Sequence, residues 1–228
     1  AENDRFNQLM VGADLDARGV ILLRALFRYL RQTGLAYGLQ TVADALRKAA
    51  PVAQGLIALF DALHDPAVQA ESAARAEAAN TAIENGLAGV AAIDDDRILR
   101  LYRAVIRATL RTNMFAPAAA EALAFKLDSA HVPGLPDPKP WREIFVYSPR
   151  VEGIHLRAGP VARGGLRWSD RRDDFRTEIL GLMKAQRVKN AVIVPTGAKG
   201  GFYPKMLPDP ANRDAWLEGT ESDRIFIR

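Results

Sequence analysis

The stretch VARGGLRWSDRRDDFRTEILGLMKAQRVKNAVIVPTGAKGGF, residues 161–202, decides the fold of the C-terminal part of the chain. Asp173 or Asp174 can cap a helix over DFRTEILGLMKAQRVKN, because several residues of this segment fall on one narrow arc at about 100° per residue. The residues on that arc are Phe175, Ile179, Leu182 and Gln186. The compact β-branched run Ala191–Val194 predicts a buried strand directly after the helix. The stretch therefore indicates an α/β unit.

Two glycine-rich turns with basic residues flank this expected helix. They are Arg163-Gly164-Gly165 and Gly197-Ala198-Lys199-Gly200-Gly201. Glycine permits positive φ and lets a ligand approach the backbone closely. Because the second turn follows the expected strand, Lys199 would lie at the carboxyl end of that strand, where ligands of α/β sheets usually bind. This placement favours a site at Lys199, and the alternative is a surface lysine in a turn.

The helix carries a second lysine of interest. On an ideal helical wheel Lys189 lies about 40° from Phe175 and shares the buried face, whereas Lys184 points to the opposite side. An apolar surround disfavours the ammonium form unless an anion is close, so a buried Lys189 suits a functional role. The alternative is a lysine that interacts with the helix C-terminus and extends outward. For the arginines of RWSDRRDDFR, the neighbouring carboxylates favour a self-neutralising surface network.

The first 130 residues predict helices, because apolar residues recur at helical spacing and alanine is frequent. We expect helices after Asp16, from Thr41 and Pro51, over the alanine-rich stretch that ends near Gly86 or Gly89, over DRILRLYRAVIRATLRT, and from Pro117. The segment HVPGLPDPKP, residues 131–140, has four prolines and marks a boundary. After it, Ile144–Tyr147 and Ile154–Leu156 predict short strands.

This pattern predicts an α+β or α/β chain. Residues 1–133 would form an all-helical region, residues 134–140 a proline-rich linker, and residues 141–228 a truncated α/β substrate-binding domain. The chain of 228 residues is 49% apolar and 25% charged, which is typical of a globular protein. No apolar stretch reaches the roughly 20 residues that cross a bilayer, and the N-terminus resembles no signal peptide. We therefore expect a cytoplasmic location and no membrane partner.

The composition also limits the chemistry. Without cysteine the chain has no disulfide, thiolate metal site or cysteine nucleophile, and its three histidines are too far apart for a local metal motif. We therefore expect no metal site. Residues 1–140 carry 15 basic and 16 acidic residues, a net charge of −1, whereas residues 141–228 carry 16 and 11, a net charge of +5. This asymmetry indicates an anionic partner, which could be a nucleic acid, a phosphate or a carboxylate.

Two nucleotide-binding signatures are missing. GAKGG does not have the spacing GxxxxGK followed by Ser or Thr, and no GxGxxG follows an expected strand. We therefore expect no dinucleotide-binding Rossmann domain in this chain.

Residues 141–205 resemble the substrate domain of the large bacterial NAD-dependent glutamate dehydrogenases. The resemblance extends from EIFVYSPRVEGIHLRAGP through GAKGGF, and the earlier segments LLRALFRYLRQTG and ATLRTN are similar to the region that precedes the catalytic part of that family. It implies that Lys199 is the catalytic lysine and that Arg163 and Lys189 hold carboxylates. The substrate site would also include Gly164, Gly165 and Gly197, while the residues that bind the cofactor stay unknown.

The resemblance further implies an enzyme of amino-acid catabolism that interconverts L-glutamate, NAD and water with 2-oxoglutarate, ammonium and NADH. NAD would be bound mainly by a domain missing from this chain, so we expect the fragment alone to be inactive and the full-length protein to be a homo-oligomer. Nucleic acid would not be a partner. Two alternatives are a basic module that binds anions or nucleic acid through residues 141–205, whose net charge is +7, and a helical interaction segment.

Overall fold

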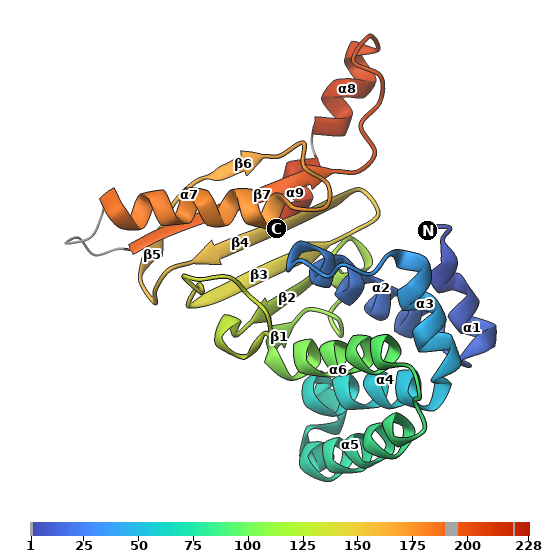
Figure 1. The fold of residues 1–228 in the computed structure, drawn as a ribbon. Coiled ribbons are helices and arrows are strands. Elements are labelled where there is room, and N and C mark those ends of the chain that lie inside the picture. The colour runs from blue at the N-terminus through green and yellow to red at the C-terminus, as the bar shows by residue number, and fades with distance from the viewer. Residues whose placement is uncertain (1, 190–195, 221) are drawn as a thin grey trace. The chain divides into compact units, whose positions relative to one another are not determined.

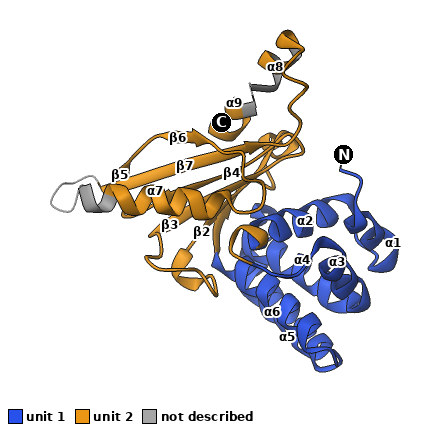
Figure 2. Cartoon of the chain, turned by 45° about the horizontal axis from the view of Figure 1, so that its top comes forward, with its two compact units in different colours: residues 1–30, 35–108 blue, residues 31–34, 109–228 orange. Residues whose placement is uncertain are grey.

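The computed structural model describes residues 2–189, 196–220 and 222–228. The chain divides into two compact units, which Figure 2 shows in different colours. Unit 1 comprises residues 1–30 and 35–108, and unit 2 comprises residues 31–34 and 109–228. Each unit has its own secondary structure and is described separately.

Unit 1 is built from helices, and its core is formed by their apolar faces. Its elements are η1 (Arg5–Gln8), α1 (Leu9–Gly12), most of α2 (Ala17–Gln32), α3 (Leu39–Lys48), α4 (Ala50–His64), η2 (Pro66–Glu71), α5 (Ser72–Ala88) and α6 (Ile93–Ala108). Leu23 and Tyr102 are fully buried, and the Tyr102 hydroxyl donates a hydrogen bond of 3.0 Å to the Leu23 carbonyl. Burial raises the pKa of Tyr102 well above its usual value, so this hydroxyl stays a donor.

Unit 2 is built on a mixed sheet of seven strands. They are β1 (Thr109–Thr112), β2 (Leu123–Leu127), β3 (Arg142–Tyr147), β4 (Val151–Arg157), β5 (Ala162–Arg163), β6 (Leu166–Trp168) and β7 (Thr196–Pro204). The strand order is β1-β2-β3-β4-β7-β5, and β6 also pairs with β7. Every pair from β1 through β4 to β7 is antiparallel, whereas β5 and β6 run parallel to β7.

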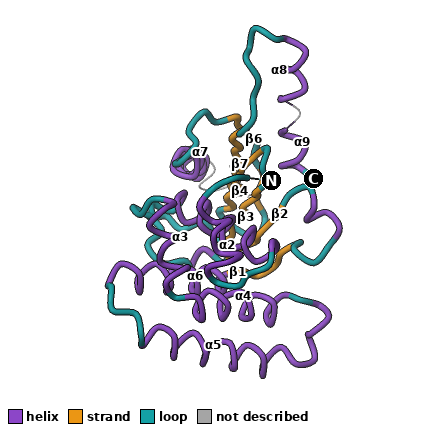
Figure 3. The backbone as a smooth tube through the Cα atoms, turned by 90° about the vertical axis from the view of Figure 1, so that its right-hand side faces the viewer, coloured by secondary structure: helices purple, strands orange, loops and turns teal. Residues whose placement is uncertain are grey.

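Helices lie on both faces of this sheet (Figures 1 and 3). On one face α7 (Phe175–Lys189) packs so closely that a Cβ added to Gly201 would overlap the Ile179 side chain. On the other face α9 (Ser222–Ile227) places Phe226 against Gly153, in a small apolar core with Phe202. The remaining elements of the unit are η3 (Pro117–Ala120), η4 (Ser129–His131) and α8 (Arg213–Thr220).

Most of the expected elements are confirmed. The structure has helices at α2 to α6, the strands β3 and β4, and the helix α7, with Phe175 and Ile179 fully buried. No helix or strand occurs from residue 132 to residue 141, as the prolines predicted. The expected strand at residues 191–194 lies outside the described residues. In the part of the chain that is described, no helix has both the length and the apolar character needed to cross a membrane.

Three expectations are wrong. The helix over DRILRLYRAVIRATLRT ends at Ala108, and Thr109–Thr112 form β1 with Leu110 exposed, so the β-branched threonines pair with β2 instead of extending the helix. Pro117 starts only a 3₁₀ turn before β2, so residues 109–127 are not part of an all-helical region. GAKGG is not a turn, because it is held in β7 between β4 on one side and β5 and β6 on the other.

Candidate functional site

Lys199 lies within β7, on the face of the sheet that α7 covers. Successive side chains of a strand point to opposite faces, so Gly197, Lys199 and Gly201 share this face. A Cβ at Gly197 would lie 2.8 Å from Cβ of Gln186 on α7. Lys199 is therefore flanked along its strand by two glycines that α7 approaches closely, and its side chain is half-buried.

The turn Arg163-Gly164-Gly165 lies beside this lysine. Arg163 pairs with Gly197 at the end of β5 and is exposed. The Gly200 amide donates a hydrogen bond of 3.1 Å to the Gly165 carbonyl, and a Cβ built on Gly165 would lie 3.8 Å from the Lys199 Nζ. The structure thus brings together Arg163, Gly165, Gly197 and Lys199.

Close approach, not positive φ, explains the glycines of this site. A Cβ on Gly164 would overlap the Ala198 carbonyl oxygen, so no side chain fits there. Among the described glycines, only Gly34 and Gly134 have positive φ. Of the two properties of glycine that the sequence analysis named, positive φ and close approach, the structure uses close approach here, because both glycine segments run alongside another strand.

Gln186 is a residue of this site that the sequence did not single out. Its Oε1 atom is buried and has no hydrogen-bond partner in the structure, and its side chain lies against Gly197. A buried acceptor without a donor is costly, so this oxygen is suited to accept a hydrogen bond from a ligand. The signal was present in the sequence, because Gln186 is a polar residue on an arc whose other named members, Phe175, Ile179 and Leu182, are apolar.

Lys189 is the last residue of α7, three positions after Gln186. Its side chain lies outside the described part of the structure, so its role in the site stays a prediction. Lys184 is exposed, as the helical wheel predicted.

The arginines between β6 and α7 follow the sequence prediction only in part. Arg167 pairs with Glu178, and Arg171 pairs with Asp174 at the surface, as expected for a self-neutralising network. Arg171 holds the pKa of Asp174 below its usual value through a hydrogen bond. Arg176, in the first turn of α7, is instead buried, with 1% of its surface exposed. Its guanidinium donates hydrogen bonds of 2.8 and 3.3 Å to Glu143.

These ion pairs weaken the interpretation of residues 141–205 as a broadly basic surface. Five of its basic residues pair with carboxylates of unit 2: Arg142, Arg167, Arg171, Arg176 and Lys205. Lys205 is itself almost buried against Glu152, at 3.1 Å. A long polyanion needs many unpaired cations on one surface, whereas a small anion needs only two or three.

His155 is not part of this site. It lies directly opposite Gly200, on the face of the sheet away from Lys199. Burial lowers the pKa of His155, and the charge of Arg157 lowers it further, so the imidazole is neutral near pH 7. Within the described residues no group of three His, Asp or Glu side chains is arranged to hold a metal ion.

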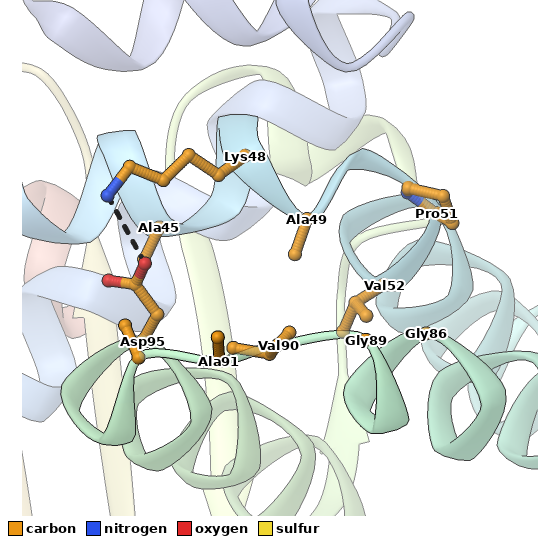
Figure 4. A pocket seen from close by; sticks show the side chains of 11 residues that line it. Ala45, Lys48, Ala49, Pro51, Val52, Gly86, Gly89, Val90, Ala91 and Asp95 are labelled. Carbon is orange, nitrogen blue, oxygen red and sulfur yellow. Dashed lines mark hydrogen bonds and ion pairs between the residues drawn. The ribbon is translucent and has the colours of Figure 1, made fainter.

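Unit 1 contains a separate hollow of about 380 Å³ (Figure 4). Small side chains line most of it, and Lys48 and Asp95 form an ion pair of 3.3 Å at one side. It includes none of the residues predicted to bind substrate, and both of its charged groups already pair with each other. The residues around Lys199 are therefore the stronger candidate.

Two family models match the chain. Residues 82–228 match the family described as bacterial NAD-glutamate dehydrogenase, catalytic domain, and residues 1–66 match glutamate dehydrogenase, helical motif 3. Both matches fall within the glutamate dehydrogenases as a class. The chain belongs to the bacterial NAD-glutamate dehydrogenase family, since the catalytic-domain match covers more than half of it.

Three curated relatives are similar along the whole chain. The NAD-specific glutamate dehydrogenase of Mycobacterium tuberculosis is 50% identical over 99% of this chain, and those of Halomonas elongata and Pseudomonas aeruginosa are each 49% identical over all of it. The chain spans only 14–15% of the length of these relatives.

Proposed function

We propose that this chain is part of an NAD-dependent glutamate dehydrogenase and supplies the pocket for the amino-acid substrate. The reaction converts L-glutamate, NAD and water into 2-oxoglutarate, ammonium, NADH and a proton, and it is reversible. The observation that supports this most is the Lys199 ammonium beside the Arg163-Gly164-Gly165 turn, in a chain of this family. A C5 dicarboxylate needs two cationic anchors, and the proposal assigns these to Arg163 and Lys189.

Lys199 would act on the reacting carbon. Its ammonium Nζ donates a hydrogen bond to the carbonyl oxygen of 2-oxoglutarate and stabilises the negative charge that develops there. In the other direction the neutral amine of Lys199 accepts the proton that the water loses when it attacks the iminium carbon. A lysine beside a glycine turn, on the face of the sheet that α7 covers, provides this charge with little reorganisation. The unpartnered Gln186 oxygen would accept a hydrogen bond from the substrate.

NAD accepts or delivers the hydride when it is bound. The residues described here do not fit a dinucleotide: no GxGxxG follows a strand, and the sheet is antiparallel through its centre. We therefore assign NAD binding mainly to another part of the full-length protein and expect the 228-residue chain alone to be inactive. Reduction of NAD by the purified chain would contradict that assignment.

The test uses the full-length protein. We expect it to oxidise NADH only when 2-oxoglutarate and ammonium are both present, and to act far more slowly on oxaloacetate or pyruvate. Calorimetric titration of the chain with 2-oxoglutarate at two salt concentrations separates this function from the basic module. Saturable binding with weak salt dependence supports a dicarboxylate pocket, whereas binding of a single-stranded oligonucleotide that falls steeply with salt would favour the module.

A further inference from the structure

Gln32 occupies an unusual position in the fold. It is the last residue of α2, yet residues 31–34 belong to unit 2 and not to unit 1. Only 2% of its surface is exposed. A buried glutamine requires hydrogen bonds for both ends of its carboxamide, and the structure provides them on one short segment, which runs from the turn before α7 into its first turn.

The carboxamide bonds with one end to the first turn of α7 and with the other to the turn that precedes it. The Arg176 amide donates a hydrogen bond of 3.0 Å to Oε1 of Gln32, and Nε2 of Gln32 donates one of 2.9 Å to the Arg172 carbonyl. The first four amides of any helix lack partners within the helix. A side chain that is about 140 residues away in sequence thus acts as a cap for α7.

An ion pair joins the same turn of α7 to the sheet. The Arg176 guanidinium pairs with Glu143 on β3, and both side chains are buried. Glu143 is directly opposite Leu156 on β4, which is directly opposite Lys199 on β7. The first turn of α7 is therefore held in two ways. Gln32 bonds to its backbone, and the Arg176 side chain attaches it, through Glu143, to the row of the sheet that carries Lys199.

The far part of α7 carries Gln186, whose side chain lies against Gly197 on β7. Gln186 is ten residues beyond Arg176, which is about 15 Å along a continuous helix. A small rotation or shift of the first turn moves the far end with it, because helices in packed interiors move as rigid bodies. We propose that Gln32 is a positioning residue for substrate binding, which sets the orientation of α7 and thereby the placement of Gln186. This inference rests on the function proposed above.

The amide chemistry of Gln32 allows a graded test. Gln32→Met keeps the length of the side chain but removes both hydrogen bonds. Gln32→Glu keeps an acceptor for the Arg176 amide. Its second carboxylate oxygen replaces the Nε2 donor, so the hydrogen bond to the Arg172 carbonyl is lost and the two oxygens repel each other. Gln54→Met is the matched control, because Gln54 also donates from Nε2 to a backbone carbonyl, that of Ala13 at 3.0 Å, but within unit 1.

The experiment measures steady-state kinetics of the full-length protein with each substitution. A misplacement of binding groups by about 1 Å can cost about 10²-fold, so we expect kcat/KM for 2-oxoglutarate to fall about 10- to 100-fold in Gln32→Met. KM for 2-oxoglutarate should rise, while KM for NADH and all constants of Gln54→Met stay within about twofold. Gln32→Glu should lie between the wild type and Gln32→Met, and it also serves if Gln32→Met does not fold.

The outcomes are distinct. An active wild type whose Gln32 variants lose thermal stability but keep their KM for 2-oxoglutarate would overturn the positioning role. A wild type without glutamate dehydrogenase activity would instead overturn the proposed function. Hydrogen exchange then decides on Gln32 separately: loss of amide protection from Arg176 to Gln186 in Gln32→Met, but not in Gln54→Met, supports its action on α7, and unchanged protection contradicts it.

Discussion

The two units treat charge in different ways. In unit 1 most ion pairs lie at the surface, as Arg100 with Asp96 does, and the interior is mainly hydrocarbon. Arg24 is the buried exception, held by Asp4. Unit 2 also has surface pairs, such as Arg171 with Asp174. In addition it buries two whole pairs, one beneath α7 and one at the end of β7: Arg176 with Glu143, and Lys205 with Glu152.

This difference indicates different tasks. Hydrophobic contacts in a core provide stability but are not directional, so they do not fix the orientation of the elements that make them. A buried ion pair adds little stability over a hydrophobic pair of the same size, but it requires one relative orientation of its two side chains. We infer that unit 1 serves mainly as a scaffold and that the interior of unit 2 is organised for orientation. The predictions below test this contrast, beginning with the largest effect.

Lys199→Met should have the largest effect, on activity alone. Loss of one preorganised donor at a reacting oxygen typically lowers kcat by about 10²- to 10³-fold, and we expect this for the full-length protein in NADH oxidation with 2-oxoglutarate and ammonium. Lys48→Met in unit 1 and Lys184→Met on the exposed side of α7 are matched controls that should keep full activity. A loss below about fivefold in Lys199→Met would remove this residue from the chemistry.

Glu143→Gln should have the next largest effect, on stability. It leaves the Arg176 charge buried without its carboxylate, and breaking such a pair typically costs about 3–5 kcal/mol. Urea unfolding followed by tryptophan fluorescence reports on this directly, because Trp141, Trp168 and Trp216 all lie in unit 2.

The matched control for this pair is Arg100→Met, which breaks an exposed pair of unit 1 and should change the unfolding transition very little. The double substitution Glu143→Leu with Arg176→Met should recover much of the lost stability while activity stays low. Recovery of both stability and activity would show that the pair has no orienting task.

Gly164→Ala should destabilise unit 2 moderately. The new Cβ would overlap a backbone oxygen of Ala198, so β5 must move away from β7, and overpacking of this kind costs about 1–3 kcal/mol. Gly86→Ala in unit 1 meets a side chain instead, that of Val52, and should cost less. Gly181→Ala, in open space on α7, should stabilise the chain by about 0.5–1 kcal/mol. Urea unfolding measures the free energy of unfolding of each variant. An equal decrease in this free energy for all three substitutions would contradict the expected order.

The smallest effect concerns pH and is shared by the two units. Burial lowers the pKa of His64 in unit 1 and of His155 in unit 2. Nε2 of His64 is also buried without a partner, so protonation there adds a donor with no acceptor. The unfolded chain therefore binds these protons more readily, and stability should be fully present above the ordinary imidazole pKa of about 6.5 and fall as the pH decreases below it.

Thermal unfolding between pH 5.5 and 7.5 checks this prediction. His64→Gln and His155→Gln should each make the fall in melting temperature between pH 7.5 and pH 5.5 smaller than in the wild type. Each should change the melting temperature at pH 7.5 by less than it changes this fall. A wild-type melting temperature that rises toward pH 5.5 would contradict the sign.

The sequence predicted unit 1 better than unit 2 for a physical reason. Helices depend on local spacing, so α2 to α6 could be located from the arginine and leucine stripes and from the prolines and glycines at their ends. Strand pairing is not local. Nothing near Thr109 showed that it would pair with Leu127, and GAKGG became a strand only because β4, β5 and β6 lie beside it.

The candidate site shows the same limit. The glycines and lysines marked its location, and the family resemblance supplied roles for Arg163, Lys189 and Lys199 that still require the tests above. Gln186 could have been found from its place on the apolar arc. Gln32 could not, because its partners are about 140 residues away and nothing in its own helix separates it from a solvent-exposed glutamine.

The two glycines that flank Lys199 on β7 have a further consequence, for conformational entropy. Because α7 lies close to Gly197 and Gly201, it covers the strand on both sides of the lysine, and the ammonium lies beside Gly165. A lysine loses up to about 2 kcal/mol of rotamer freedom when it is immobilised. Any rotamers that folding already removes from Lys199 are not lost a second time when a substrate contacts the ammonium.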